Sequence, residues 1–425
     1  MNCFTEKLSD NKNIYFLENK SMKSIIIWFM YYMPLDSLAS ENALVSSVLL
    51  RGCSKYPTSK EISRFLNSNY GSIVGSDINL KGEIYTLSIH LNYINPGLEC
   101  VENDYEDEML DFLHNIIYSP KTSKGGFDND YFESEKRNLL SAFKGKINDK
   151  ESYAFDRAIQ CMCKEEAYSI DRLGTLESIE NLTNTKCYQR YKEIINNMPL
   201  NVYVMGNVDS NEFLSKLKTK FNFTPSKSIV PKIIKKIPGE LNVVNENIDT
   251  NQGKLVIGYR TDIDINSADF PALSVVNRLF GGGPEARLFT NLRERESLCY
   301  TIYSTVEKHK GMLFVACGID PSSRDLAITK IEETLLSIKN GDFTEIEIET
   351  AKAATKHSLK GIKDNKYTYI GYMQGLNIYS SNYTLDELCE RISAVTKDDV
   401  IKAANSVMID TIYFLGRTED DKEKK

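Results

Sequence analysis

The chain has 425 residues, a length that usually needs more than one hydrophobic core, so two domains or two large lobes are expected. Hydrophobic residues make up 41% of the chain and charged residues 26%, which excludes the compositions typical of disordered and of membrane proteins. The formal net charge of −7 disfavours nucleic acid as the main partner, because phosphate binding needs a concentrated basic surface.

The first strongly apolar segment is "SIIIWFMYYM", which begins at Ser24. It is far shorter than the roughly 18 to 20 residues that span a bilayer, so a buried strand is expected rather than a membrane segment. The N-terminal sequence lacks an apolar signal core, and the nine cysteines are odd in number and scattered. These features predict a cytoplasmic protein with reduced thiols.

An internal repeat organises the rest of the chain. The helical segment "ALVSSVLLRG" from Ala43 has a counterpart in "ALSVVNRLFGG" from Ala272, and each follows an apolar strand. Each is followed by a second helix and by a hairpin with alternating polar and apolar residues, at 72–94 and 300–320. The strand "NVYVMGNVD" from Asn201 likewise matches "TIYFLGRTED" from Thr411.

The repeat predicts an α+β fold of two homologous domains, each a mostly antiparallel sheet with helices packed on one face. The segment "SKSIVPKIIKKIPGE" carries two prolines and no clear period, which is typical of a linker. The predicted organisation is therefore an N-terminal domain at 1–225, a linker at 226–240 and a C-terminal domain at 241–425.

Three consecutive glycines, Gly281, Gly282 and Gly283, precede Pro284, a residue suited to a first helical turn. Gly281, Gly283 and Ala286 fit a loose dinucleotide-binding pattern, but a helix rather than a strand is expected before them. No Gly-Lys-Ser/Thr follows, and nearby glutamates would repel phosphate. The alternative is a helix stop and tight turn in which glycine tolerates a positive φ.

The stretch "GGGPEARLFTNLRERESLCY" resembles the C-terminal domain of the M16 metallopeptidases, the family of insulinase, pitrilysin and the mitochondrial processing peptidase. The resemblance continues through "EEAYSIDRLGTLESIENLTNTKCYQRYKEIINNMPLNVYVMGNVD" and covers nearly the whole chain. It implies two α+β domains joined by a linker, in agreement with the repeat.

In that family, H-x-x-E-H on a helix supplies two zinc-binding histidines and a glutamate general base. The segment that matches it here is "ALVSSVLLRGC", so the resemblance places Ala43 and Ser47 at the histidine positions and Ser46 at the base. The third ligand position falls on Ala142. No metal site is therefore expected in this chain.

No other cluster replaces the lost ligands. The four histidines and the pair Cys161 and Cys163 suggest no metal site, and so few histidines suggest no Ser-His-Asp or Cys-His constellation. We expect the histidines to lie on the surface or to be satisfied by neighbours; they are His90, His114, His309 and His357, and His90 is expected to be solvated.

Arg293 and Tyr300 keep the family's arginine–tyrosine spacing. The resemblance implies that they reach peptide substrate and stabilise an oxyanion, a role for which a guanidinium and a phenol are suitable donors. The chain thus resembles the zinc-free subunit of a heterodimeric peptidase whose partner carries H-x-x-E-H and zinc, with the three glycines in the wall of the peptide chamber. No nucleic acid or membrane partner is expected.

Three alternatives remain open at this point. Arg293 could pair with Glu294 or Glu296 and Tyr300 could be an ordinary edge residue, in which case neither has a functional role. The chain could also be a non-catalytic peptide-binding or assembly scaffold. A stand-alone enzyme with unrecognised chemistry is disfavoured by the shortage of histidines.

Overall fold

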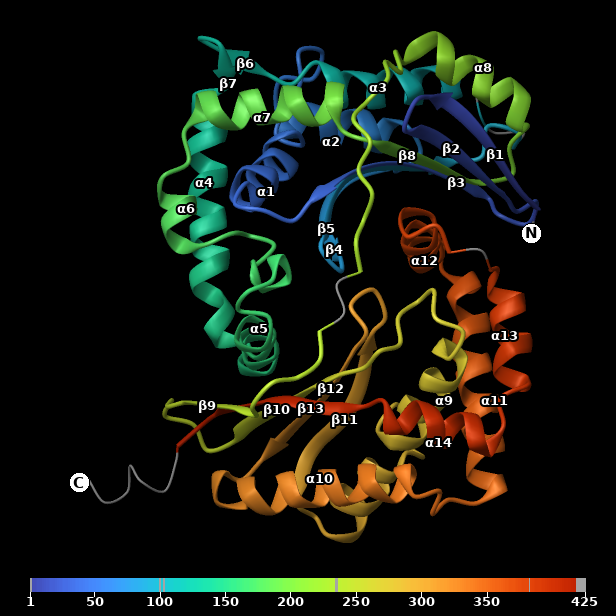
Figure 1. Cartoon of the computed structure of the whole chain (residues 1–425). Coiled ribbons are helices and arrows are strands. Elements are labelled where there is room, and N and C mark those ends of the chain that lie inside the picture. The colour runs from blue at the N-terminus through green and yellow to red at the C-terminus, as the bar shows by residue number, and fades with distance from the viewer. Residues whose placement is uncertain (1, 99–100, 102–103, 234–235, 382, 418–425) are drawn as a thin grey trace. The chain divides into compact units, whose positions relative to one another are not determined.

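The computed structural model describes residues 2–98, 101, 104–233, 236–381 and 383–417 (Figure 1). Two compact units make up the chain: Met1–Lys144 with Ile170–Pro231, and Gly145–Ser169 with Lys232–Lys425. Residues 145–169, which the sequence places in the N-terminal domain, therefore group with the second unit. Within 226–240, the described residues form neither helix nor strand.

The first unit is built on a six-stranded sheet with the order β1-β2-β8-β3-β5-β4. All neighbours pair antiparallel except β2 and β8, which are parallel. The apolar run after Ser24 forms the buried strand β3, as expected. The strands are β1 (Asn2–Ser9), β2 (Lys12–Glu18), β3 (Ser24–Pro34), β4 (Ile73–Lys81), β5 (Ile84–Ile94) and β8 (Leu200–Gly206).

One hydrophobic cluster joins this sheet to its helices, because alternate strand residues such as Ile25, Ile27 and Phe29 point to the same face. The helices are α1 (Ala39–Val48), α2 (Ser59–Ser68), α3 (Tyr105–Tyr118), α4 (Asn129–Gly145), α6 (Leu176–Glu180), α7 (Asn184–Asn197) and α8 (Ser210–Lys220). Two short strands, β6 (Thr122–Ser123) and β7 (Gly126–Phe127), and the 3₁₀ turn η1 (Lys146–Asn148) lie beside α4 in the sequence.

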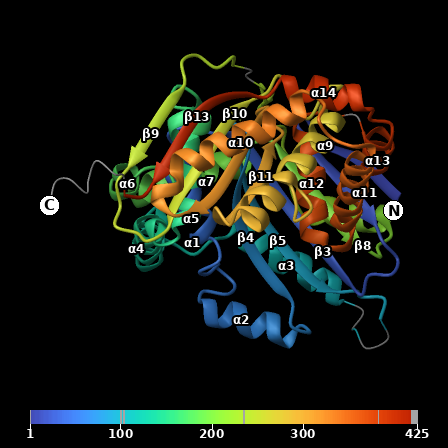
Figure 2. The same cartoon turned by 90° about the horizontal axis from the view of Figure 1, so that it is seen from below.

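The second unit repeats the same sheet with one strand fewer, in the order β11-β12-β10-β13-β9. Only β13 and β9 are parallel. Figure 2 shows β9, β13 and β10 side by side. The strands are β9 (Asn242–Glu246), β10 (Gly253–Arg260), β11 (Cys299–Glu307), β12 (Met312–Ile319) and β13 (Met408–Leu415).

Read from the other end, this order corresponds strand by strand to β2-β8-β3-β5-β4 of the first sheet. The parallel pair lies at the same place in both sheets. The expected fold class, α+β with two related domains and mostly antiparallel sheets, is thus confirmed. The first sheet differs only by the additional edge strand β1.

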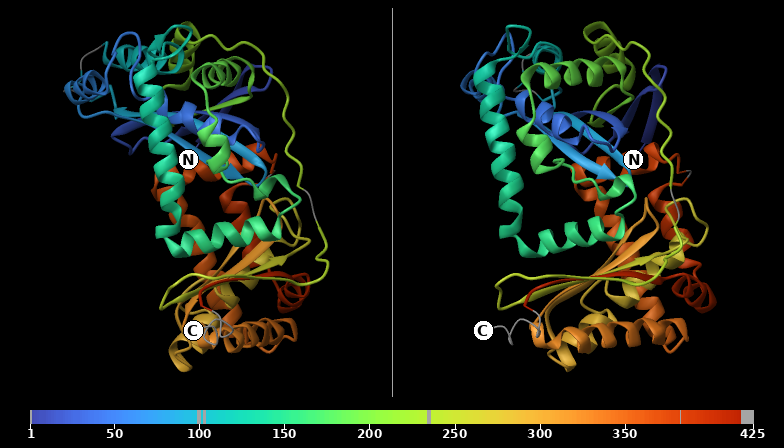
Figure 3. Two further views of the ribbon diagram at one scale, coloured as in Figure 1. Left: turned by 90° about the vertical axis from the view of Figure 1, so that its left-hand side faces the viewer. Right: turned by 60° about the vertical axis from the view of Figure 1, so that its left-hand side comes forward.

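The second sheet is covered on both faces, which the sequence does not indicate. Leu255, Ile257 and Tyr259 point into a cluster with the unit's own helices, whereas Val256 points into a second cluster with Ala154 and Ala158 of α5 (Lys150–Met162). Figure 3 shows the green helix α5 on one side of this sheet and the orange helix α10 on the other. The remaining helices of the unit are α9 (Phe270–Phe280), α10 (Arg324–Lys339), α11 (Glu345–Gly361), α12 (Lys366–Ile378), α13 (Leu385–Ser393) and α14 (Lys397–Asn405), with 3₁₀ turns η2 (Ala167–Ser169), η4 (Pro321–Ser323) and η5 (Ile362–Asp364).

Candidate functional site

The positions that match the zinc motif lie on the regular helix α1 and hold only small side chains. Ala43 is buried in the core of the first unit. The Ser46 hydroxyl lies 2.7 Å from the Ser76 hydroxyl of β4, and the exposed Ser47 hydroxyl donates to the Ala43 carbonyl at 3.3 Å. Ala142 is an exposed residue of α4. Methyl groups and mutually bonded hydroxyls do not fit a zinc ion, which prefers imidazole, thiolate and carboxylate ligands.

No group of three or more His, Cys, Asp or Glu side chains that could hold a metal ion occurs in the described part of the chain. Burial raises the pKa of the Cys163 thiol to about 12 and also raises that of Cys161, which makes both poor nucleophiles.

The buried histidines pack against neighbouring side chains. His90 is 8% exposed, and its ring packs at a tilt against Trp28 with the ring centres 5.0 Å apart, so the expectation that it is solvated is wrong. The His309 ring nitrogen Nδ1 lies 3.0 Å from the Glu307 carboxylate, and the ring packs at a tilt against Tyr379. Although burial acts to raise the pKa of Glu307, its hydrogen bond with His309 lowers it. Both rings are therefore parts of packed structure.

The glycine triplet ends α9 as expected, but for a different reason. Gly281 is the C-cap of the helix with φ −151°, and none of the three glycines adopts a positive φ. A Cβ on Gly281 would instead lie 2.8 Å from the Ser304 main-chain nitrogen, which donates to the Gly281 carbonyl at 2.9 Å. The glycines thus allow the loop to approach the strand β11. The next helical segment begins after Pro284, near Arg287.

Arg293 lies on a π-helix, η3 (Phe289–Arg295), and is exposed. Its guanidinium lies 4.7 Å from the centre of the Phe289 ring, a cation–π contact, and no ion pair with Glu294 or Glu296 is found for it among the described residues. π-Helical turns are rare and occur frequently at functional sites. Arg293 is therefore held by an aromatic ring with its charge unneutralised.

Tyr300 lies at an irregularity of β11. The pairing with β12 shifts register between Cys299 and Thr301, so Tyr300 is the extra residue of a β-bulge, and it is 61% exposed. Between Arg293 and Tyr300, Ser297 adopts a left-handed conformation with φ 50°. A bulge changes the direction in which a side chain points. A non-glycine residue in the left-handed conformation costs free energy, which the surrounding structure must supply.

A cavity of about 910 Å³ opens beside these elements, within the second unit. The glycine loop, Phe289, the β11 residues 302–305 and the first turns of α5 line it. Burial raises the pKa of Tyr303 in this wall, and the nearby carboxylates of Glu151 and Asp149 raise it further. The cavity is thus lined by the Phe289 ring, which contacts Arg293, and by an acidic wall that α5 contributes.

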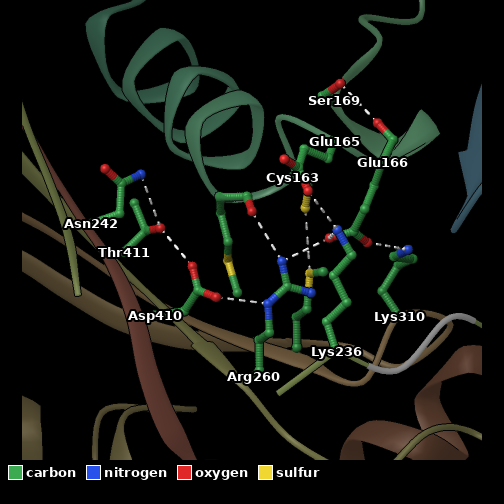
Figure 4. A network of polar contacts seen from close by, with 12 residues as sticks. Cys163, Glu165, Glu166, Ser169, Lys236, Asn242, Arg260, Lys310, Asp410 and Thr411 are labelled. Atoms are coloured by element: carbon green, nitrogen blue, oxygen red, sulfur yellow. Dashed lines mark hydrogen bonds and ion pairs between the residues drawn. The ribbon is translucent and has the colours of Figure 1, made fainter. Parts of the chain in front are cut away.

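Two charged clusters anchor α5 to the second sheet. Near the end of the helix, Glu166 accepts from Arg260 and from Lys310, both at 2.7 Å, and Arg260 also donates to Asp410 at 2.7 Å (Figure 4). Glu166 and Lys310 have side chains that are 2% and 0% exposed. Nearer its start, Tyr153 and Arg157 of α5 both bond to Glu246 of β9.

Sequence reasoning did not identify this anchor. Arg260 and Asp410 carry no local motif, and Glu166 lies about 90 residues from its first partner in the chain. The one available signal was the charged residue at the end of the apolar strand "KLVIGYR", because charged side chains are rarely buried unless paired.

These features define a duplicated α+β protein in which the zinc-binding positions have lost their ligands. Residues 181–355 match the family model described as the peptidase M16 inactive domain. The chain is 31% identical over 415 residues, 95% of each sequence, to the probable inactive metalloprotease YmfF of Bacillus subtilis strain 168. The chain therefore belongs to the M16 peptidase family, and it is a homologue of a probable inactive metalloprotease.

Solved structures share this fold over the full length. A conserved protein of Enterococcus faecalis V583 matches with a TM-score of 0.89 and 26% identity, covering 99% of this chain and 100% of that chain. A peptidase M16 inactive domain from Pseudomonas fluorescens matches with a TM-score of 0.80 and 16% identity, covering 98% of this chain and 99% of that chain.

No helix in the described residues is both long and apolar enough to span a bilayer.

Proposed function

We propose that this chain is the zinc-free subunit of a heterodimeric M16-type peptidase. The partner subunit supplies H-x-x-E-H, zinc and the general base, and this chain supplies Arg293 and Tyr300. It has no peptidase activity alone, because Ala43, Ser46, Ser47 and Ala142 provide neither ligand nor base. Peptide is the substrate class, and neither nucleic acid nor membrane is a partner.

One observation carries the proposal: the backbone is irregular where Arg293 and Tyr300 lie. A π-helix, a left-handed serine and a β-bulge occur within 289–300, and both side chains are exposed. A left-handed non-glycine residue costs about 1–3 kcal/mol, and such strain, like π-helical turns and β-bulges, is frequent at functional sites. By contrast, an arginine and a tyrosine that served only the fold would need neither the π-helix nor the bulge.

The roles follow from the chemistry of amide hydrolysis. Attack on a peptide carbonyl develops negative charge on its oxygen, and donors aimed at that charge stabilise the transition state. The Tyr300 hydroxyl donates one hydrogen bond, whereas the Arg293 guanidinium presents a planar set of donors that can also hold substrate carbonyls in the ground state. Loss of Tyr300 should therefore affect kcat, and loss of Arg293 should affect both kcat and KM.

The test is co-expression with an M16 chain that carries H-x-x-E-H, followed by a peptide-cleavage assay on the purified complex. Tyr300→Phe should lower kcat by about 10²–10³, the usual cost of one oxyanion donor, without preventing assembly. Arg295→Ala is the matched control for Arg293→Ala. Arg295 is exposed on the same π-helix as Arg293, and among the described residues it bonds only to the Asn291 side chain.

Size-exclusion chromatography must confirm that each variant forms the complex before rates are compared. Full activity from an assembled Arg293→Ala/Tyr300→Phe variant would overturn the shared site and favour a non-catalytic scaffold. One tightly bound zinc per isolated chain would contradict the zinc-free assignment.

A further inference from the structure

The first unit has a helix that the described part of the second unit lacks. In the first unit, α8 follows β8 and packs beside α3 (Figure 1). Phe213 and Leu217 of α8 are buried, and the Phe213 ring lies 6.1 Å from that of Phe16 on β2, so α8 covers this side of the sheet. In the second unit, β13 takes the place of β8, but the described residues that follow it, Gly416 and Arg417, form no helix.

The sheet face that α8 covers in the first unit is open in the second. β2 and β9 correspond, since each pairs in parallel with the last strand of its unit. Val202 and Ile412 hold the same position in the repeated last strand, and Ile412 points to the helix side of its sheet. Their partners, which point to the same face, are Ile14 on β2 and Val243 on β9. Ile14 is 0% exposed, whereas Val243 is 49% exposed.

The helix α10 runs alongside β13, next to this open face. At one end, the Arg324 guanidinium lies 5.6 Å from the centre of the Phe414 ring. At the other end, the Lys339 ammonium donates to the Val407 carbonyl at 2.6 Å, just before β13 begins. A groove of about 490 Å³ follows α10 and includes Lys339 in its lining. The groove therefore lies on the side of α10 toward β13 and β9, which corresponds to the place of α8.

The groove offers an apolar surface and one carboxylate to a partner. Leu336 in its lining is 55% exposed. Glu332 accepts from the Tyr259 hydroxyl at 2.6 Å, and no ion pair is found for it among the described residues. Lys339 interacts with Glu332 only at longer range, because its ammonium is bound to a carbonyl. Glu333, which also lines the groove, is already paired with a lysine of the same helix.

The first unit shows what such a carboxylate binds. Glu106 of α3 accepts from the Tyr93 hydroxyl at 3.4 Å and from Lys216 of α8 at 2.8 Å. Glu332 of α10 has the tyrosine hydroxyl but not the lysine. In α8 this lysine lies between two buried apolar residues that are four positions apart, so all three side chains share one face of the helix.

We propose that this groove is a docking site for an amphipathic helix of a partner protein, which takes the place in the second unit that α8 takes in the first. The helix carries apolar residues at i and i+4 against Leu336 and Val243, and a lysine or arginine at i+3 toward Glu332. A helix laid into an apolar groove is a recurrent mode of recognition. Residues 418–425 contain no apolar residue and cannot supply this helix. The site lies on the face of the sheet opposite α5 and uses no residue of the proposed active site, so it is independent of the proposed function.

The experiment uses the full chain and a fluorescein-labelled peptide that carries residues 210–221 between flanking alanines. A lactam bridge between positions 211 and 215, which are both exposed in α8, holds the peptide helical without altering its apolar face. In anisotropy titrations the peptide should bind saturably, and Leu336→Asp should weaken binding by about tenfold or more. Leu326→Asp is the matched control, because Leu326 is 51% exposed on the same helix but does not line the groove, and it should leave the affinity unchanged.

A double-mutant cycle tests the charge. Glu332→Gln keeps an acceptor for the Tyr259 hydroxyl but removes the negative charge. It should weaken binding of the lysine peptide by about three- to fivefold at low salt. It should not affect a counterpart peptide with glutamine at the position of Lys216, because that peptide has no charge to lose a partner. Melting temperatures should establish that every variant is folded.

Equal binding of the peptide to the wild type and to Leu336→Asp would overturn the proposal, because the peptide would then occupy another place, such as that of α8 in the first unit. Absence of saturable binding up to millimolar concentration would also overturn it. A concentration-dependent dimer that Leu336→Asp abolishes and Leu326→Asp preserves, measured by sedimentation equilibrium, would assign the groove to a second copy of the chain instead. None of these outcomes depends on turnover of an assembled peptidase complex, which tests the proposed function alone.

Discussion

The two units share a strand order, but the segments between their first helices and their hairpins differ in regularity. In the first unit this segment is α2, an ordinary helix with a capping box formed by Thr58 and Glu61, and β4 pairs with β5 without interruption. In the second unit it is a π-helix without a side-chain cap, and the bulge at Tyr300 follows it. Both segments contain a left-handed non-glycine residue before the hairpin, Tyr70 in the first unit and Ser297 in the second.

Under the proposed function, this difference separates positions that serve the fold from positions that serve catalysis. The zinc motif of the family falls on the regular helix α1, where Ala43 packs in the core and the Ser46 and Ser47 hydroxyls are hydrogen-bonded. The arginine–tyrosine pair lies on the irregular segment of the second unit. The sheet of that unit also carries the helix α5 on its second face. The following variants test this contrast, from the largest expected effect to the smallest.

The largest effect should come from breaking the network that anchors α5. Glu166→Gln leaves Arg260 and Lys310 buried without full compensation, and loss of one partner of a buried ion pair typically costs about 3–5 kcal/mol. We expect this loss in the free energy of unfolding measured with urea, together with faster amide exchange in 150–162. Glu165→Gln is the matched control, because the neighbouring Glu165 side chain is 87% exposed and should change stability by less than about 0.5 kcal/mol.

The same network predicts an acid dependence. Burial acts to raise the pKa of Glu166, but its hydrogen bonds with Lys310 and Arg260 outweigh burial and lower the pKa below its ordinary 4.5. A lowered pKa stabilises the folded state above the unfolded value, and this stability is lost as the pH falls through the folded pKa. The wild type should therefore lose more stability than Glu166→Gln between about pH 5 and pH 3; parallel losses in the two proteins would contradict the assignment.

Gly281→Ala should have the next largest effect. Its Cβ would lie 2.8 Å from the Ser304 main-chain nitrogen, which cannot move without disturbing β11, so a loss of about 1–3 kcal/mol is expected. The control is Gly371→Ala in α12, where a Cβ meets no atom within 4 Å. There the higher helix propensity of alanine should raise the free energy of unfolding by about 0.5–1 kcal/mol. Equal effects of the two changes on thermal unfolding would show that the glycine loop does not depend on close contact.

Much of the fold of the two units could be predicted from the sequence, but the contacts that group 145–169 with the second unit could not. Alternation and glycine punctuation located the strand after Ser24, the two hairpins and the helix that ends at Gly281, because these patterns are local. The duplication followed from comparing the halves. The assignment of 145–169 to the second unit was not accessible, because it depends on partners such as Arg260 and Asp410 far along the chain.

The site shows the same limit. The spacing of Arg293 and Tyr300 pointed to the pair, but nothing in "FTNLRERESLCY" indicates a π-helix or a bulge, since its residues are compatible with an ordinary helix followed by a strand. The glycine loop was located correctly, but its requirement for close contact rather than a positive φ depends on where Ser304 lies.

Ser297→Gly should relax the irregular segment. A left-handed conformation costs a non-glycine residue about 1–2 kcal/mol, part of which is offset by the greater chain entropy of glycine when unfolded, so a gain of about 0.5–1 kcal/mol is expected. Ser406→Gly is the control, because Ser406 has φ −77° and gains nothing from glycine. If the strain serves the proposed site, turnover of the assembled complex should fall while stability rises; unchanged turnover would separate the strain from function.

The smallest effect on turnover should come from the former zinc motif itself. Ser46→Ala removes the 2.7 Å hydrogen bond to Ser76 and should cost about 0.5–1.5 kcal/mol, because it leaves the partner hydroxyl unsatisfied. Ser46→Ala/Ser76→Ala removes both hydroxyls and should recover part of that loss, since replacing both partners is nearly neutral. Turnover of the assembled complex should not change in either variant. A rate loss of tenfold or more from Ser46→Ala would mean that this position of α1 still acts in catalysis, and that the contrast between the two units does not separate fold from function.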